Sequence, residues 1–199
     1  MEVVRLRYGN TNTFFVRGDM GGLLVDTDMA GSMGRFFKAL KRAGIRMGDI
    51  SWAMATHFHP DHAGLLGEMQ AMGVRVLLLK EQEGYEGYSD RIYERMGAEY
   101  RPVDRAKARV IPCGESRAFL AEMGIGGEIL HTPSHSPDSV AVVLDDGECL
   151  VGDLEPWGYL EGYGENEGLR SDWERIMGRG VKRVWFGHAN EKWVERVDE

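Results

Sequence analysis

The sequence Thr56-His57-Phe58-His59-Pro60-Asp61-His62 places three imidazoles and a carboxylate in one short stretch, directly after the largely apolar run 50–55. That run has the pattern of a buried strand. In an extended segment, side chains two residues apart point the same way, so His57 and His59 can converge on one ion. Pro60 suits the first turn of a helix, so Asp61 and His62 leave the backbone in another direction and can reach a second ion. This N/O donor set favours Zn²⁺ but also accepts Fe, Mn or Co.

Composition limits the classes of protein to consider. The chain has 199 residues, of which 43% are hydrophobic, which is enough for one domain with a full core, and we expect residues 1–199 to form a single domain. The net charge of −8 disfavours nucleic acid and anionic membranes as partners. The N-terminus lacks the pattern of a signal peptide, and no apolar run approaches the roughly 18 residues of a membrane span. The two cysteines, Cys113 and Cys149, have the character of reduced thiols. We therefore predict a cytoplasmic protein that acts on a small molecule.

The order of predicted elements indicates an α/β fold. Strands and helices alternate in the first part of the chain, and strands dominate from about residue 127. The predicted strands are residues 3–7, 13–17, 23–27, 50–55, 74–79, 128–131, 139–144, 148–151 and 181–186. The predicted helices are residues 33–43 with Ser32 as N-cap, residues 61–72, and a short helix to Met177 opened by a capping box at 171–174.

Three more candidate ligands follow predicted strands. His135, Asp153 and His188 each lie at or just beyond a strand end, and such loops gather at one rim of a layered fold. Five of the six histidines in the chain belong to the combined set. Clusters of histidine and aspartate of this kind mark metal or catalytic sites.

The chain resembles the metallo-β-lactamase superfamily of hydrolases. The resemblance runs from Asp26-Thr27 through the histidine stretch and Gly152-Asp153 to Gly187-His188. It implies a four-layer αβ/βα sandwich, in which two sheets pack face to face with helices outside. It also implies two metal sites, each with its own ligands. By resemblance the first metal is held by His57, His59 and His135, the second by Asp61, His62 and His188, with Asp153 bridging both.

The resemblance also gives Asp26 a role and exposes two departures. Asp26 would steady the histidine loop without touching the metals, as carboxylates behind metal ligands do. The family usually has glycine where this chain has Asp28, and Thr-Pro-Gly-His where this chain has Ser134 before His135. His59 speaks against the flavodiiron branch, which carries glutamate there. The segment after Asp153 is not basic, which speaks against glutathione thioesters.

The expected chemistry is hydrolysis by two metals about 3.5–4 Å apart that share a hydroxide. The hydroxide would attack a carbonyl or phosphoryl centre, and Asp61 would orient it and accept its proton. We expect two divalent ions, zinc first with iron or manganese as alternatives, and a lactone, thioester or other ester-like substrate. A phosphodiesterase or nuclease is one alternative. A mononuclear iron dioxygenase of the sulfur-oxidising kind, or a metal-binding protein without turnover, is another. The sequence leaves the substrate and the oligomeric state open.

The sequence also predicts which residues line the substrate pocket. Aromatic residues near the ligand loops could cover apolar substrate surface: the segment around Tyr85–Tyr93 on one side, and Trp157–Tyr159 with Tyr163 on the other. The charged segment 80–109 is either a solvated helix and loop or a cover for the site, in which Arg91 or Arg95 would meet an anionic group. His131 lies four residues before His135, and we interpret it as a packing or surface residue, with a substrate contact as the alternative.

Overall fold

The computed structural model describes residues 1–160 and 166–194, which form two β-sheets. The six-stranded sheet has the order β1-β2-β3-β4-β5-β6, with β1 to β3 antiparallel and β3 to β6 parallel. Its strands are β1 (Glu2–Leu6), β2 (Thr13–Gly18), β3 (Gly21–Val25), β4 (Ile50–Met54), β5 (Arg75–Leu79) and β6 (Arg109–Ile111).

The five-stranded sheet is built from the C-terminal part of the chain. Its order is β11-β10-β9-β8-β7, and only β9 and β10 run parallel. Its strands are β7 (Gly127–His131), β8 (Val140–Leu144), β9 (Glu148–Leu150), β10 (Arg183–Trp185) and β11 (Lys192–Trp193).

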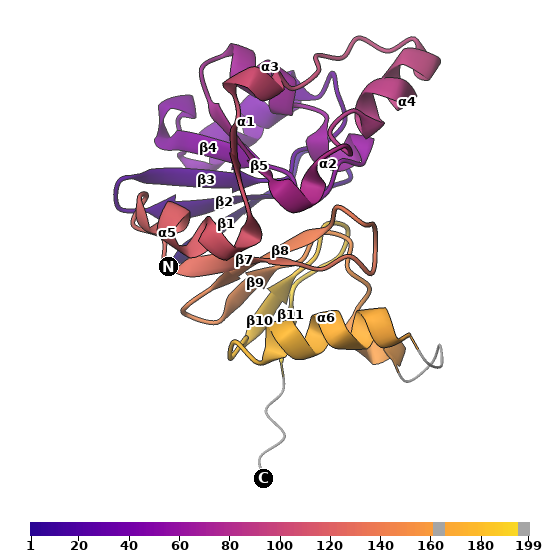
Figure 1. Cartoon of the computed structure of the whole chain (residues 1–199). Coiled ribbons are helices and arrows are strands. Elements are labelled where there is room, and N and C mark those ends of the chain that lie inside the picture. The colour runs from indigo at the N-terminus through magenta and orange to yellow at the C-terminus, as the bar shows by residue number, and fades with distance from the viewer. Residues whose placement is uncertain (161–165, 195–199) are drawn as a thin grey trace.

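Three apolar clusters hold the layers together. One lies between the sheets and joins residues such as Met54 of the first sheet to Val142 of the second. Another packs the first sheet against α1 (Met33–Ala43) and α3 (Leu66–Ala71), and the third packs the second sheet against α6 (Glu167–Met177). Figure 1 shows the resulting order, with α1 and α3 over the N-terminal sheet and α6 beneath the C-terminal one. The predicted four-layer αβ/βα sandwich is confirmed.

The remaining helices are short and lie in the connections. The α-helices are α2 (Pro60–Ala63), α4 (Tyr88–Met96) and α5 (Ser116–Ala121). The 3-10 turns are η1 (Met47–Asp49), η2 (Lys80–Gln82), η3 (Arg105–Lys107), η4 (Cys113–Glu115) and η5 (Trp157–Leu160). No helix within residues 1–160 and 166–194 is long and apolar enough to cross a membrane.

Helix α1 follows the predicted pattern, but its cap does not. Phe36, Ala39 and Leu40 are buried on one face, and Gly44 ends the helix with φ of 68°. Ser32 occupies the N-cap position, yet its Oγ donates to the carbonyl of Met29 instead of accepting from the helix.

The predicted helix 61–72 is wrong in one respect, because it is broken into α2 and α3. At the break, a Cβ on Gly64 would lie 2.4 Å from the backbone nitrogen of Ala30, so the chain crosses its neighbour too closely for a side chain. The Leu65 amide donates to Thr27 Oγ1 at 3.1 Å, which gives this backbone group a partner outside the helix.

The capping box predicted at 171–174 is also wrong. Helix α6 begins at Glu167, after Asn166, whose side chain accepts from the Leu169 amide at 3.0 Å. Asp172 therefore lies inside the helix and is buried. The short elements β6 and α5 were not predicted, because their apolar residues are too few to show a period in the sequence.

Candidate metal centre

The predicted ligands meet at one rim of the sandwich. The histidine stretch follows β4, His135 lies between β7 and β8, and Asp153 and His188 follow β9 and β10. Within each of two groups, one ligand atom from every residue lies within 4.8 Å of the others. The first group is His57, His59, His135 and Asp153, and the second is Asp61, His62 and His188.

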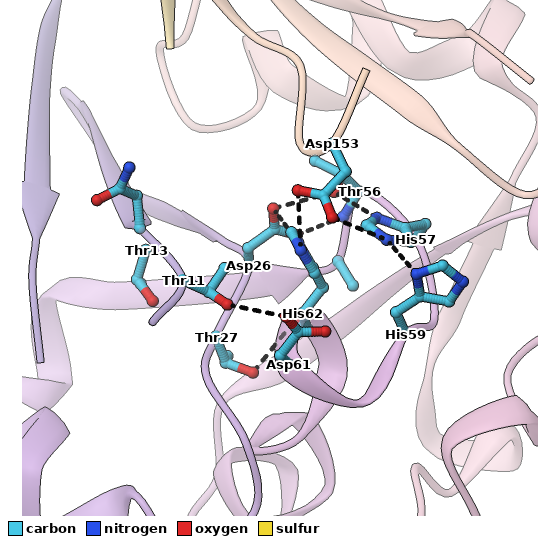
Figure 2. Close-up of polar contacts among 12 residues, drawn as sticks. Thr11, Thr13, Asp26, Thr27, Thr56, His57, His59, Asp61, His62 and Asp153 are labelled. Carbon is cyan, nitrogen blue, oxygen red and sulfur yellow. Dashed lines mark hydrogen bonds and ion pairs between the residues drawn. The ribbon is translucent and has the colours of Figure 1, made fainter. Parts of the chain in front are cut away.

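The nitrogen atoms of the imidazoles face one another inside each group. His57 Nε2 lies 3.0 Å from His59 Nδ1 in the first group, and His62 Nε2 lies 3.3 Å from His188 Nε2 in the second. Asp153 stands between the groups, with Oδ1 3.2 Å from His62 Nε2 and Oδ2 3.9 Å from His57 Nε2. In Figure 2 the carboxylate of Asp153 faces both imidazoles.

Hydrogen bonds on the far side of the rings leave lone pairs for a metal. His62 Nδ1 is 2.9 Å from Asp26 Oδ2, an acceptor, so Nδ1 carries the proton and Nε2 carries the lone pair. His188 Nδ1 is 3.1 Å from the carbonyl oxygen of Asn10, with the same result. Thr56 Oγ1 donates to Asp26 and is 3.1 Å from His57 Nδ1, so it accepts from that ring.

The donor set fits two divalent ions. Asp153 Oδ1 is buried and has no hydrogen-bond partner of good geometry in the described residues, although His62 is near. A buried carboxylate oxygen without a partner is costly, and a cation bound there removes the cost. Facing imidazole nitrogens likewise fit an ion placed between them. The residues present therefore suit the metals that the sequence predicts, and their ligation stays a prediction.

Asp26 supports both groups from below. It is fully buried, and it accepts hydrogen bonds from the Thr56 amide at 2.6 Å and from Thr56 Oγ1 and His62 Nδ1 at 2.9 Å each. Its φ of 60° makes it the one non-glycine among the described residues in the left-handed region. That conformation costs on the order of 1–2 kcal/mol, less for aspartate than for most residues, so the surrounding contacts hold it in place.

Electrostatics differ between the groups. Burial disfavours a charged His62, but Asp26 and Asp153 outweigh it and raise the pKa of His62 to about 10. Hydrogen bonds with Asp153 and Asp61 raise the pKa of His188 to about 11. The second group thus strongly favours positive charge: without a metal both imidazoles carry a second proton, on the Nε2 atom that a bound cation would take over. In the first group, burial lowers the pKa of His57 and of His135, which keeps both imidazoles in the neutral form that binds metal.

The two acidic candidates stay ionised. The hydrogen bond with His188 is the main cause that lowers the pKa of Asp61. Burial alone would raise the pKa of Asp153, but the neighbouring imidazoles of His188 and His62 hold it well below its usual range. Both carboxylates are therefore in the form that a metal requires.

Two cavities meet at His135. One of about 390 Å³ borders Asp153 and His188, and Tyr159 lies in its wall. The other, of about 240 Å³, borders His59 and is walled by Phe58, Tyr85 and Tyr88. The ring centroid of Tyr88 lies 5.3 Å from that of His59.

The other predicted pocket residues that the structure describes lie elsewhere. Trp157 packs edge-on against Trp173, with ring centroids 5.2 Å apart, and joins the cluster under α6. Arg91 and Arg95 are exposed on α4 and line neither cavity. Tyr163 lies outside the described residues. A substrate-binding role for Tyr85, Trp157 and Tyr159 stays a prediction.

His131 lies outside both donor groups. Its Nε2 donates to the carbonyl of Pro137 at 2.7 Å, and its own carbonyl accepts from Arg175. His131 thus braces the loop that carries His135.

Sequence reasoning missed the residues that hold the ligand loops from behind. Asn12 donates from Nδ2 to the carbonyls of Phe186 and Ala189 at 2.8 Å each, and from its amide to Gly187 at 2.7 Å, so it brackets His188. Tyr93 donates from its hydroxyl to the carbonyl of Pro60 at 2.8 Å. The partners are backbone atoms far away in the chain, and such pairs leave no motif in the sequence.

The fold and the site together define a layered α/β protein with a histidine-rich candidate metal centre at its rim. The chain belongs to the metallo-beta-lactamase superfamily, whose family model matches residues 6–188. A comparison with curated proteins found no match.

Solved structures share the fold at low sequence identity. TTHA1623 in a di-iron-bound form is 22% identical, with a TM-score of 0.70, and the match covers 97% of this chain and 94% of that one. The BLEG-1 B3 metallo-beta-lactamase is 18% identical, with a TM-score of 0.71 and coverage of 96% and 94%. The metallo-beta-lactamase family protein TTHA1429 from Thermus thermophilus is 21% identical, with a TM-score of 0.66 and coverage of 96% and 73%.

Proposed function

We propose that this protein is a binuclear metal-dependent hydrolase that cleaves a lactone, thioester or other ester-like bond in a small molecule. The observation that carries the proposal is the pair of donor groups, with Asp153 between them and imidazole lone pairs directed inward. Membership of the superfamily supports the same reaction class.

Two bound divalent ions would supply Lewis acidity and an activated water for attack on the scissile carbonyl. The role of the chain is to hold and orient the reacting groups. Asp61 is our candidate for orienting the attacking water and accepting its proton. Its Oδ2 lies 3.2 Å from His188 Nε2 and 3.5 Å from Thr11 Oγ1, so the carboxylate is held against the second group.

The cavities favour an uncharged or cationic substrate. No lysine or arginine lines either cavity in the described part of the chain, and Asp138 and Glu155 add negative charge. Such walls disfavour an anionic substrate group beyond the reach of the metals. This charge pattern supports an ester-like substrate over a phosphodiester or a nucleic acid.

The identity of the metal is part of the proposal. Imidazole and carboxylate ligands suit zinc, iron and manganese alike, and we propose zinc first. The di-iron form of TTHA1623 supports iron as the alternative.

The test is elemental analysis of the chain as purified and after zinc reconstitution, followed by assay of chromogenic esters, lactones, thioesters and bis-phosphates. We expect two ions per chain, and turnover of a carbonyl substrate that stops on chelation. A ceiling of one ion after reconstitution would contradict the binuclear site. Turnover of bis-phosphates alone would replace the proposal with a phosphodiesterase, and one iron per chain with oxygen uptake would replace it with a dioxygenase.

A further inference from the structure

The buried acidic residues in the described part of the chain all lie behind the proposed metal ligands. Four aspartates in the described part of the chain are buried, with exposed fractions of 3% or less: Asp26, Asp28, Asp138 and Asp172. A buried carboxylate is costly unless hydrogen-bonded, so its partners show what its burial stabilises.

Two of these aspartates hold the histidine stretch. Asp26 accepts from Thr56 and His62, as described above. Asp138 Oδ2 accepts from the Phe58 amide at 2.7 Å, and Phe58 stands between His57 and His59.

Asp172 holds the residue before His135. From inside α6, its Oδ2 accepts from the Ser134 amide at 3.0 Å and from Ser134 Oγ at 2.6 Å. The second bond depends on the serine hydroxyl, which a glycine at position 134 would lack. Ser134 therefore ties the His135 loop to a helix that packs on the second sheet.

Asp28 holds the partner of His188. Its Oδ2 accepts from the Asn10 amide at 3.1 Å, and the Asn10 carbonyl accepts from His188 Nδ1 at 3.1 Å. A Cβ on Gly9 would lie 1.0 Å from Asp28 Oδ2, so the carboxylate fills the space beside this loop. A glycine at position 28 would leave the Asn10 amide without this acceptor.

We propose that Asp172 and Asp28 are positioning residues, one for each donor group: Asp172 sets His135 through Ser134, and Asp28 sets His188 through Asn10. They supply the anchors at the two places where the sequence departs from the family pattern. His135 and His188 need such anchors because their side chains are 24% and 41% exposed. The side chains of His57 and His62 are at most 1% exposed, so packing already fixes them. An anchored loop pays less of its ordering entropy when it binds a ligand. The inference rests on the metal assignment of the proposed function.

The test measures zinc affinity, ion by ion, in competition with a chelator. Asp172→Asn should weaken the first ion about 10–100-fold, the usual effect of losing a partner behind a ligand, and leave the second within about twofold. Asp28→Asn should do the reverse. Asp145→Asn is the matched control, because Asp145 is an exposed carboxylate that pairs with Arg117 away from the ligands, and it should change neither affinity.

Double variants assign the ions to the groups. In the His188→Ala background, Asp172→Asn should lower the affinity for the single remaining ion. In the His135→Ala background, Asp172→Asn should not change the affinity for the ion that remains there, because the residue that Asp172 positions is gone. Asp28→Asn should show the opposite pattern. If Asp172→Asn does not fold, Ser134→Ala removes only the 2.6 Å bond and should weaken the first ion in the same direction.

Thermal unfolding with excess chelator separates positioning from general stability. If each aspartate substitution lowers the affinity for both ions equally, in step with the loss of stability of the metal-free chain, the positioning roles are wrong. If neither affinity changes, they are wrong as well. A wild-type chain that binds fewer than two ions overturns the proposed function together with this inference, whereas two tight ions with unselective variants overturn this inference alone.

Discussion

The two halves of the sandwich present their candidate metal ligands in different ways. The N-terminal half offers His57, His59, Asp61 and His62 in one continuous stretch after β4, and a single buried residue, Asp26, contacts it at both ends. The C-terminal half offers His135, Asp153 and His188 one at a time, from three separate loops.

This difference predicts which substitutions affect both donor groups and which affect only one. A change at Asp26 reaches His57 through Thr56 and reaches His62 directly, so both donor groups should respond. In the described part of the chain, a change behind the His135 loop or the His188 loop has no such route to the other group. Three experiments test this difference between the halves.

Substitution of Asp26 should have the largest effect on metal affinity. Asp26→Asn keeps the shape of the side chain, and asparagine tolerates the left-handed backbone at this position. An amide, however, turns one acceptor into a donor, which leaves Thr56 or His62 facing the wrong partner in a buried site. We expect both zinc affinities to fall at least about tenfold and the midpoint of thermal unfolding to drop. A selective loss of one ion in a chelator titration would break the idea of a shared anchor.

Substitution of the C-terminal candidate ligands should have the next largest effect on metal binding. His135→Ala and His188→Ala should each leave about one ion per chain with the fold retained, because both side chains lie partly exposed at the rim. Elemental analysis and circular dichroism measure the two quantities. His131→Ala is the comparison variant: it removes the hydrogen bond to the Pro137 carbonyl that braces the His135 loop but no donor of either group, so it should retain both ions. The opposite result at positions 131 and 135 would mean that the ligand assignment is shifted by four residues.

The smallest effect should come from the cavity walls. Tyr85→Ala and Tyr159→Ala each remove one aromatic wall from a different cavity, so each should raise KM by up to about tenfold, or about 1.4 kcal/mol, with metal content unchanged. Trp157→Ala should instead lower stability, on the order of 2 kcal/mol, because Trp157 packs against Trp173. A KM effect at Trp157 larger than at Tyr159 would restore Trp157 as a substrate contact.

That the candidate ligands come together was accessible from the sequence, because each lies in a local pattern. His57 and His59 directly follow an apolar strand, and in an extended segment side chains two residues apart point the same way. His135, Asp153 and His188 come at strand ends. The α/β class followed from the alternation of strands and helices, whereas the four-layer sandwich was implied by the family resemblance. These signals span a few residues each, which is the range over which a sequence pattern constrains structure.

The supports behind the ligands were not accessible. Asp172 bonds Ser134 across 38 residues, and Asn10 bonds His188 across 178, in the second case through a backbone carbonyl that any residue carries. Asp172 even matched a local capping pattern that the structure does not use. Long-range contacts to backbone atoms depend on how the layers meet, and no short motif encodes them.

The bracket that Asn12 forms around residues 186–189 has a consequence for biosynthesis. Asn12 lies in the first hairpin, and its partners follow the last but one strand, so the two can meet only when both sheets have been made. His188 is also the last of the seven ligand candidates to leave the ribosome. A chain interrupted during translation therefore carries the histidine stretch without the means to close the second site. On the proposed ligand assignment, tight binding of a second ion would therefore require a chain translated beyond β10.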